Sequence, residues 1–196
     1  MYSRFGRFLD SVGDFLVNLL VFAAIGFTVY RETGWTPVYL VAFVGFLGIS
    51  LRVSYHVYYQ TSFLHLRSAY DVNRVTEEIR EEDLVGEPRA LRMQRLFLFL
   101  YGWQDNLMVR LDRWSMRGVS TQRTEEWYGN RTALVLSGFL GIGTELFILM
   151  LFSLARRLDL YLWVNIVGLN GVWGICVLYR RGVLARRLRQ AIPSNS

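Results

Sequence analysis

Four long apolar stretches, each almost free of charged residues, dominate the hydrophobic pattern of the chain. They run from about 11 to 30, 36 to 58, 132 to 154 and 158 to 179. A helix needs about 20 residues to cross the hydrocarbon core of a bilayer, and each stretch has that length. Short turns at 31–35 and 155–157 join them in pairs. The pattern predicts an all-α fold, a polytopic membrane bundle of four transmembrane helices in a single domain over residues 1–196.

The first stretch has an alternative interpretation as a secretory signal peptide, which Arg4 and Arg7 would suit. Asp10 and Asp14 do not suit one, and no small-x-small cleavage site precedes Arg31. Three further spans make a membrane helix the simpler interpretation.

A polar segment, residues 59–131, separates the second and third stretches. Its part from Tyr70 to Asp83 is acidic and predicts a solvated helix or loop. From 91 to 114 the pattern becomes amphipathic, with apolar residues recurring every three or four positions (Leu100, Trp103, Leu107, Leu111 and Trp114) and polar residues on the other face (Gln104, Asp105, Arg110, Asp112 and Arg113). This favours a helix in the membrane interface. The apolar stripe could equally pack on the cytoplasmic ends of the spans, and the two alternatives are not exclusive.

Composition narrows the class of protein further. Apolar residues make up 53% of the chain, charged residues only 19%, and the mean hydropathy is +0.24. These values argue against a soluble enzyme and against disorder. The only cysteine, Cys176, excludes an internal disulfide and a cysteine-based zinc site. All 22 basic residues are arginine, which excludes lysine Schiff-base catalysis.

The arginines predict the orientation of the bundle. Eighteen of them precede the first stretch, lie between the second and third, or follow the fourth, and only three lie in the two short turns. The positive-inside rule then places both termini and the 59–131 insertion in the cytoplasm, and we expect a multi-pass protein of the plasma (inner) membrane. The pI near 9.8 could also indicate nucleic-acid binding. We expect no nucleic-acid partner, because glutamates interrupt the basic residues and no continuous basic face forms.

Candidate chemistry lies at the start of the first stretch. Gly6, Asp10, Asp14 and Asn18 are four residues apart, so they share one face of a helix. Two carboxylates one turn apart offer the hard oxygen ligands that Mg²⁺ prefers and leave coordination positions for phosphate oxygens. Carboxylates inside a membrane span are costly and indicate function. The alternative is that both aspartates simply solvate the cytoplasmic end of the span.

This stretch resembles the second half of the signature of the CDP-alcohol phosphotransferases, integral membrane enzymes of phospholipid synthesis. The full signature reads D-x-x-D-G-x-x-A-R, about eight further residues, and then G-x-x-x-D-x-x-x-D. Gly6, Asp10 and Asp14 match the second half, and Phe5, Leu9 and Ser11 add to the likeness. The direct match covers about ten residues, while helix count and orientation extend it loosely over the chain.

The sequence also departs from the family. The first half of the signature would lie upstream of Met1, and the family has six spans where we count four. The chain therefore resembles spans three to six of such an enzyme. A mis-assigned start, a truncated gene and a degenerate relative all remain open as explanations.

The resemblance implies a mechanism and a set of partners. Two Mg²⁺ or Mn²⁺ ions bind the pyrophosphate of a CDP-linked donor, an alcohol acceptor attacks, and CMP leaves. Asp10 would bind metal, and Asp14 would bind metal and act as the catalytic base. Gly6 would make room for the nucleotide. The family also implies a homodimer, surrounded by membrane lipids. The acceptor remains open among glycerol phosphate, inositol phosphate, serine and aminoalcohols.

Arg52, Glu145 and Asn165 are three further polar residues of interest inside the predicted spans. Arg52 is a candidate for binding a substrate phosphate, because guanidinium pairs with phosphate in a bidentate manner. It could instead extend to the membrane interface. Glu145 lies on one stripe with Ser137 and Gly141, a small-residue face suited to close helix packing. Asn165 lies at a similar depth on the antiparallel neighbour, so we expect Glu145 and Asn165 to form a structural pair.

Two functions from different classes follow. The first is a membrane-embedded transferase that moves a phosphoalcohol or phosphatidyl group from a CDP-linked donor to an alcohol in phospholipid synthesis. The second is a non-enzymatic or degenerate membrane protein, such as an assembly partner, in which the aspartates are inert.

Overall fold

The computed structural model describes residues 4–66 and 88–190, and within these ranges the chain is helical with no strand. Its main helices are, in order, α1 (Arg4–Thr33), α2 (Val38–Leu66), α4 (Pro88–Ser115), α5 (Thr124–Tyr128), α6 (Arg131–Gly138), α7 (Ile142–Leu154), α8 (Leu158–Trp163), α9 (Asn170–Leu178) and α10 (Ala185–Gln190). Two π-helical segments, η3 (Val164–Leu169) and η4 (Tyr179–Leu184), connect the last three helices, and a short 3₁₀ turn, η2 (Thr121–Arg123), precedes α5. The acidic stretch 70–83 lies outside the described residues.

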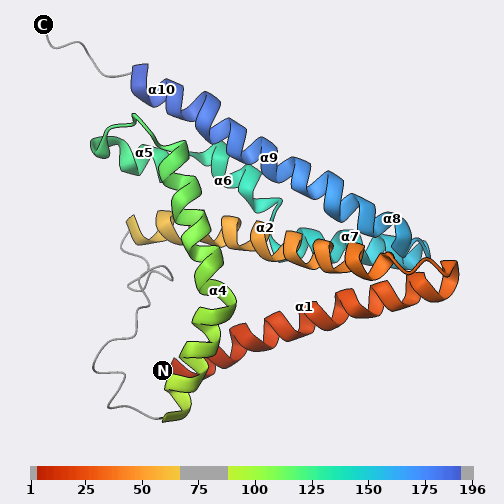
Figure 1. Ribbon diagram of the computed structural model, residues 1–196. Helices are drawn as coiled ribbons and strands as arrows, with labels where there is room; N and C mark the ends of the chain where they lie inside the picture. The colour runs from red at the N-terminus through yellow and green to blue at the C-terminus, as the bar shows by residue number, and fades with distance from the viewer. Residues whose placement is uncertain (1–3, 67–87, 191–196) are drawn as a thin grey trace, which may run out of the picture.

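Helices α1 and α2 form the first hairpin (Figure 1). Gly34, with φ +70°, adopts the left-handed conformation that ends α1, and Pro37 precedes the first turn of α2. Buried apolar side chains from both helices join two residues of α8 in one core cluster (Phe22, Ile25, Val29, Val38, Ala42, Phe46, Ile49, Tyr161 and Leu162). Edge-to-face aromatic contacts, such as Phe15 with Phe46 at 5.2 Å between ring centroids, add to this packing.

The second hairpin is less regular than the sequence pattern predicted. Its first span is broken at 139–141 into α6 and α7, and Gly141 precedes α7 with an extended backbone at φ −71° and ψ 156°. The Ser137–Gly141–Glu145 stripe is thus interrupted, although Ser137 and Glu145 are both buried. After the turn at 155–157, the last span runs without a break from α8 to α10 and includes both π-helical segments.

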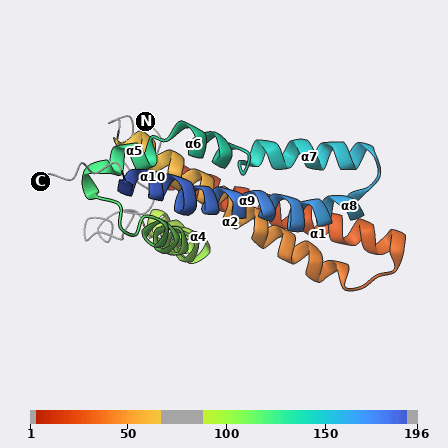
Figure 2. The same ribbon diagram turned by 90° about the horizontal axis from the view of Figure 1, so that it is seen from above.

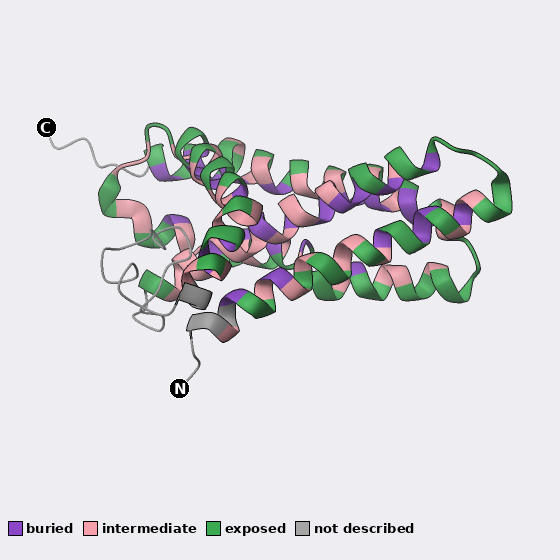
Figure 3. Ribbon diagram, turned by 60° about the horizontal axis from the view of Figure 1, so that its bottom comes forward, coloured by how far each residue is buried: buried purple, intermediate pink, exposed green. Residues whose placement is uncertain are grey.

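The described chain has four helical segments long and apolar enough to cross a membrane: Phe8–Thr33, Val38–Leu66, Arg131–Leu154 and Leu158–Gln190. This confirms the predicted number of spans and the all-α class. Both hairpin turns lie at one end of the bundle, and α5 and the N-terminal end of α1 lie at the other (Figure 1). Buried positions face the middle of the bundle, and exposed positions, many of them apolar, cover the outside (Figure 3).

Helix α4 crosses α1 and α2 steeply, and α6 and α7 lie on the opposite side of the layer formed by α2 and α9 (Figure 2). The apolar stripe of α4 is mostly exposed and does not pack on the ends of the spans, and its place in the membrane interface stays a prediction. Gln104 and Asp112, on the polar face of the pattern, are buried against the bundle, whereas Trp103, Leu107 and Trp114 are exposed. The cause is a set of polar partners on α2, beginning with the Ser54 hydroxyl, which donates to Gln104 Oε1 at 2.7 Å.

Candidate functional site

The predicted N-terminal stripe lies on α1. Asp10 and Asp14 are both exposed, and Gly6 and Asn18 are half-buried. The Asn18 amide donates to the backbone carbonyl of Asp14 at 2.9 Å, a contact within one helical turn. The structure therefore places the two aspartates on one exposed face of the first span, as the spacing predicts.

Asp14 borders a cavity that Asp10 does not line. This cavity has a volume of about 390 Å³ and lies between α1, α2, α4 and α7. Asp14 lies on its wall, and Asp10 and Gly6 do not. The other polar residues of the wall come from all the surrounding helices and from α8 (Ser11, Asn18, Ser50, Ser54, Tyr101, Glu145 and Tyr161). The rest of the wall is apolar, so the site suits a ligand that is largely hydrocarbon with a polar end.

Helix α4 closes one side of this cavity. The Tyr101 hydroxyl donates to the carbonyl oxygen of Ser11 at 2.9 Å, and the Phe8 and Phe97 rings lie 5.3 Å apart. These contacts hold α4 against the first turns of α1. Without α4 the wall near Asp14 would be open on that side.

The described residues do not supply the donors of a two-ion metal centre. No group of three or more His, Cys, Asp or Glu side chains comes together within 4–66 and 88–190. Asp10 and Asp14 alone could hold a single Mg²⁺ together with substrate phosphates and water. The predicted Mg²⁺ or Mn²⁺ therefore stays a prediction.

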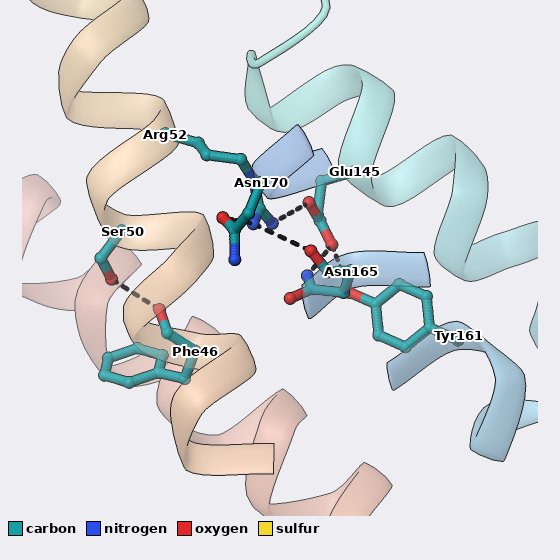
Figure 4. Close-up of polar contacts among 7 residues, drawn as sticks. All are labelled: Phe46, Ser50, Arg52, Glu145, Tyr161, Asn165 and Asn170. Atoms are coloured by element: carbon teal, nitrogen blue, oxygen red, sulfur yellow. Dashed lines mark hydrogen bonds and ion pairs between the residues drawn. The ribbon is translucent and has the colours of Figure 1, made fainter. Parts of the chain in front are cut away.

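Arg52 forms an ion pair inside the bundle (Figure 4). Its Nη2 lies 2.8 Å from Glu145 Oε2, and the two side chains are only 1% and 5% exposed. Its Nη1 donates to the Asn165 carbonyl at 3.1 Å and to Asn170 Oδ1 at 2.7 Å. A substrate phosphate would have to compete with these partners, so the geometry favours a structural role for Arg52. Substrate binding by Arg52 stays a prediction.

The other carboxylate oxygen of Glu145 has two donors of its own. The Tyr161 hydroxyl donates to Oε1 at 2.6 Å, and the Asn165 amide donates to the same oxygen. The expected Glu145–Asn165 contact is therefore present. The sequence analysis did not connect this contact with Arg52, Tyr161 or Asn170. The depths of Arg52 and Glu145 in facing spans could have indicated their ion pair.

A second buried carboxylate is that of Asp112 on α4. Its Oδ1 accepts from the Tyr59 hydroxyl and the Trp127 indole, each at 2.9 Å. Its Oδ2 accepts from the hydroxyls of Tyr128 at 2.6 Å and Tyr58 at 3.2 Å. Burial, and then the nearby Asp112 carboxylate, raise the pKa of Tyr128 well above its usual range. Tyr128 therefore remains a hydrogen-bond donor at all physiological pH values.

Arg180 completes this second cluster. Its guanidinium carbon lies 3.5 Å from the centroid of the Tyr59 ring, and its Nη1 donates to the Trp127 carbonyl at 3.1 Å. The Tyr59 ring thus lies in contact with both the Arg180 cation and the Asp112 carboxylate. Arg180 belongs to η4, as Asn165 belongs to η3, so each π-helical segment contributes one buried polar residue to a cluster. Such segments often occur at functional sites.

Comparison of the chain with protein-family models, with curated proteins and with solved structures finds no match. The likeness to the CDP-alcohol phosphotransferases therefore depends on the motif residues themselves.

Proposed function

We propose that this chain acts on an amphiphilic lipid substrate, which occupies the cavity between α1, α2, α4 and α7 with its polar end at Asp14. The observation that carries the proposal is the position of Asp14 on the wall of that cavity. A carboxylate at the edge of a largely apolar cavity, inside a span, has a cost that a functional role would explain.

The specific form of the proposal is transfer of a phosphoalcohol or phosphatidyl group. The acceptor hydroxyl oxygen attacks the β-phosphorus of a CDP-linked donor, and the bond from that phosphorus to the bridging oxygen breaks. CMP leaves with the bonding electron pair, and Asp14 accepts the hydroxyl proton. Asp14 suits this role better than Asp10, because only Asp14 borders the space in which an acceptor would lie.

The orientation is part of the same proposal. We infer that the termini and the 59–131 insertion lie in the cytoplasm of a cell with this protein in its plasma (inner) membrane, because the arginines gather on that side. Helix α4 then lies in the cytoplasmic interface of the membrane. This places the Asp14 end of the cavity near the side where soluble nucleotide is available.

A non-enzymatic membrane protein is the second candidate. The observation that favours it is that three buried charged residues have partners within the protein. Arg52 and Glu145 satisfy one another, Asp112 has four donors, and the described residues hold no cluster of metal ligands. In such a protein Asp14 would contact a bound lipid without any reaction.

Release of CMP separates the two candidates. The full chain in lipid nanodiscs, with CDP-diacylglycerol, Mg²⁺ and a panel of alcohols, should release CMP. Asp14→Asn should lower turnover by roughly 10²-fold or more, as expected for loss of a general base. Asp10→Asn should raise the Mg²⁺ concentration required. Asp159→Asn, an exposed carboxylate at the opposite end, is the matched control. If the intact chain releases no CMP with any alcohol in the panel, the transferase proposal fails and the non-enzymatic one replaces it.

A further inference from the structure

The outward face of α4 carries large apolar side chains beside arginines. Five apolar residues are exposed along it, and Phe99 is the most exposed at 78% (Leu96, Phe99, Trp103, Leu107 and Trp114). The opposite face of the helix packs on the bundle through Phe97, Gln104, Met108 and Asp112, all buried. Helix α4 therefore already packs on the bundle with one face, and the exposed apolar stripe is a second, separate face.

The exposed face divides into two edges. With about 100° per residue, Trp103 and Trp114 lie about 20° apart on the circumference of the helix, next to Leu96 and Leu107. Arg95 and Arg113 are five full turns apart, so they lie on one line, about 80° from Trp103. Both arginines are exposed. The apolar residues are here called the tryptophan edge, the Arg95/Arg113 line is the arginine edge, and the exposed Arg92 and Arg110 lie between them, about 20° from Trp103.

Arg181 of η4 brings a third cation to this surface. Its guanidinium carbon lies 3.3 Å from the centroid of the Trp114 ring, and the side chain is exposed. Among the residues that the structure describes, Arg95, Arg113 and Arg181 form no ion pair with a carboxylate. The tryptophan edge therefore ends beside uncompensated positive charge.

We propose that this surface binds anionic phospholipids of the cytoplasmic leaflet, with acyl chains along the tryptophan edge and the phosphate at Arg95, Arg113 and Arg181. Charge complementarity indicates which lipid binds. Apolar area alone would suit any lipid, whereas three arginines without a carboxylate partner favour a negative headgroup. Tryptophan rings favour the same depth, at the boundary between hydrocarbon and headgroups. The proposal rests on the orientation proposed above and is independent of any reaction at Asp14.

Association of spin-labelled lipids with the reconstituted chain tests this proposal. Spin-labelled phosphatidylglycerol should associate more strongly than spin-labelled phosphatidylcholine. The triple variant Arg95→Gln/Arg113→Gln/Arg181→Gln should lower that preference by at least about fivefold, the factor expected for a single arginine near an anionic surface. The triple Arg→Lys variant should keep most of the preference. The matched control Arg131→Gln/Arg186→Gln/Arg187→Gln removes the same charge from exposed positions of α6 and α10 and should change it less than twofold.

A second measurement tests the lipid site even if the triple variant folds poorly. A nitroxide at Phe99→Cys, in a Cys176→Ser background, should be more accessible to oxygen than to a water-soluble nickel chelate. Equal loss of lipid preference in the control triple would overturn the proposal, as would a nitroxide fully accessible to nickel. Spin–spin broadening at Phe99 between copies would overturn it in favour of a second copy of this chain as the occupant. None of these readouts depends on CMP release, so the proposed function can fail while the lipid site holds, or the reverse.

Discussion

Arg52 of α2 and Glu145 of α7 form a buried ion pair at 2.8 Å between two predicted membrane spans. Removing two charges from water costs several kcal/mol for each ion, and a single contact does not recover it. Here neighbouring polar groups add hydrogen bonds to both members of the pair. Asn165 and Asn170 accept from Arg52, and Tyr161 donates to Glu145. The pair therefore fixes how α2, α7 and the last span fit together.

Removal of one charged partner should destabilise the protein much more than removal of both. Arg52→Leu or Glu145→Leu alone leaves an uncompensated buried charge and should lower the free energy of unfolding by about 3–5 kcal/mol. The double variant Arg52→Leu/Glu145→Leu should recover most of that loss. Unfolding of the purified chain in mixed micelles with increasing SDS measures all three variants.

The exposed pair of Arg157 and Asp159 serves as the control for these variants, because its nitrogen and oxygen are 3.0 Å apart on the surface. Its disruption should change stability little, since solvent screens exposed pairs. If both single Leu variants also unfold like the wild type, the buried pair does not hold the spans together.

Gly45 should tolerate no side chain, because a Cβ there would lie 2.8 Å from Phe22 Cε1 and 3.1 Å from Asn165 Oδ1. The Phe22 ring is buried in the core and cannot move away easily. Gly45→Ala should therefore cost about 1–3 kcal/mol. Gly171→Ala, where nothing lies within 4 Å, should be neutral or stabilising through better helix propensity. The same SDS titration checks both, and a destabilised Gly171→Ala would contradict the packing argument.

Hydrophobic periodicity predicted the spans because a bilayer imposes one simple requirement on them, about 20 apolar residues. It did not predict the break at 139–141, since Gly138 and Gly141 in an apolar stretch are equally compatible with a continuous helix. It also missed the π-helical segments. They place Asn165 and Arg180 in the interior, and this depends on partners from distant helices.

The sequence also left open which face of α4 packs on the bundle, for a related physical reason. An amphipathic pattern identifies two faces, and the usual assumption is that the polar face meets water. On α4, Gln104 and Asp112 instead face the bundle, because Ser54, Tyr58 and Tyr59 offer them partners there. In a membrane interface the apolar face can meet lipid, so sequence alone does not decide which face packs inward. The stripe of Asp10 and Asp14, by contrast, depends only on helix geometry and lies as predicted.

Loss of the Asp112 carboxylate should detach α4 from the bundle. Asp112→Ala leaves four donors without their acceptor and should cost at least about 3 kcal/mol, since hydrogen bonds to a charged group contribute about 1.5–3 kcal/mol each. Asp112→Asn should be intermediate, because one oxygen remains. Asn106→Ala, at an exposed position of the same helix, should have little effect. Limited proteolysis between α4 and α5 should accelerate in the order wild type, Asn, Ala; equal rates would contradict the anchoring role.

The orientation predicts which cysteines can be labelled from outside sealed cells. In a Cys176→Ser background, Thr33→Cys in the first hairpin turn should react with an impermeant maleimide. Ser120→Cys, between α4 and η2, should react only after the membrane is opened. The physical reason is the gathering of arginines at the Ser120 end of the bundle. The reverse pattern would invert the orientation and move the Asp14 end of the cavity to the other side.

A bulky side chain inside the cavity should block the lipid substrate without unfolding the protein. Ser50 lies on the cavity wall in α2, where its hydroxyl donates only to the Phe46 carbonyl one turn earlier. In Ser50→Phe, an aromatic ring would take up space that the proposal assigns to the acyl part of the ligand, and the loss of this local hydrogen bond should cost little. Lipid co-purified with the variant should fall several-fold by mass spectrometry, and CMP release should fall with it. Val44→Phe, on the exposed side of the same helix, is the matched control and should change neither. If Ser50→Phe retains both lipid and activity, the ligand lies elsewhere. If the wild-type chain releases no CMP and Ser50→Phe still loses lipid, the result supports the non-enzymatic lipid-binding protein.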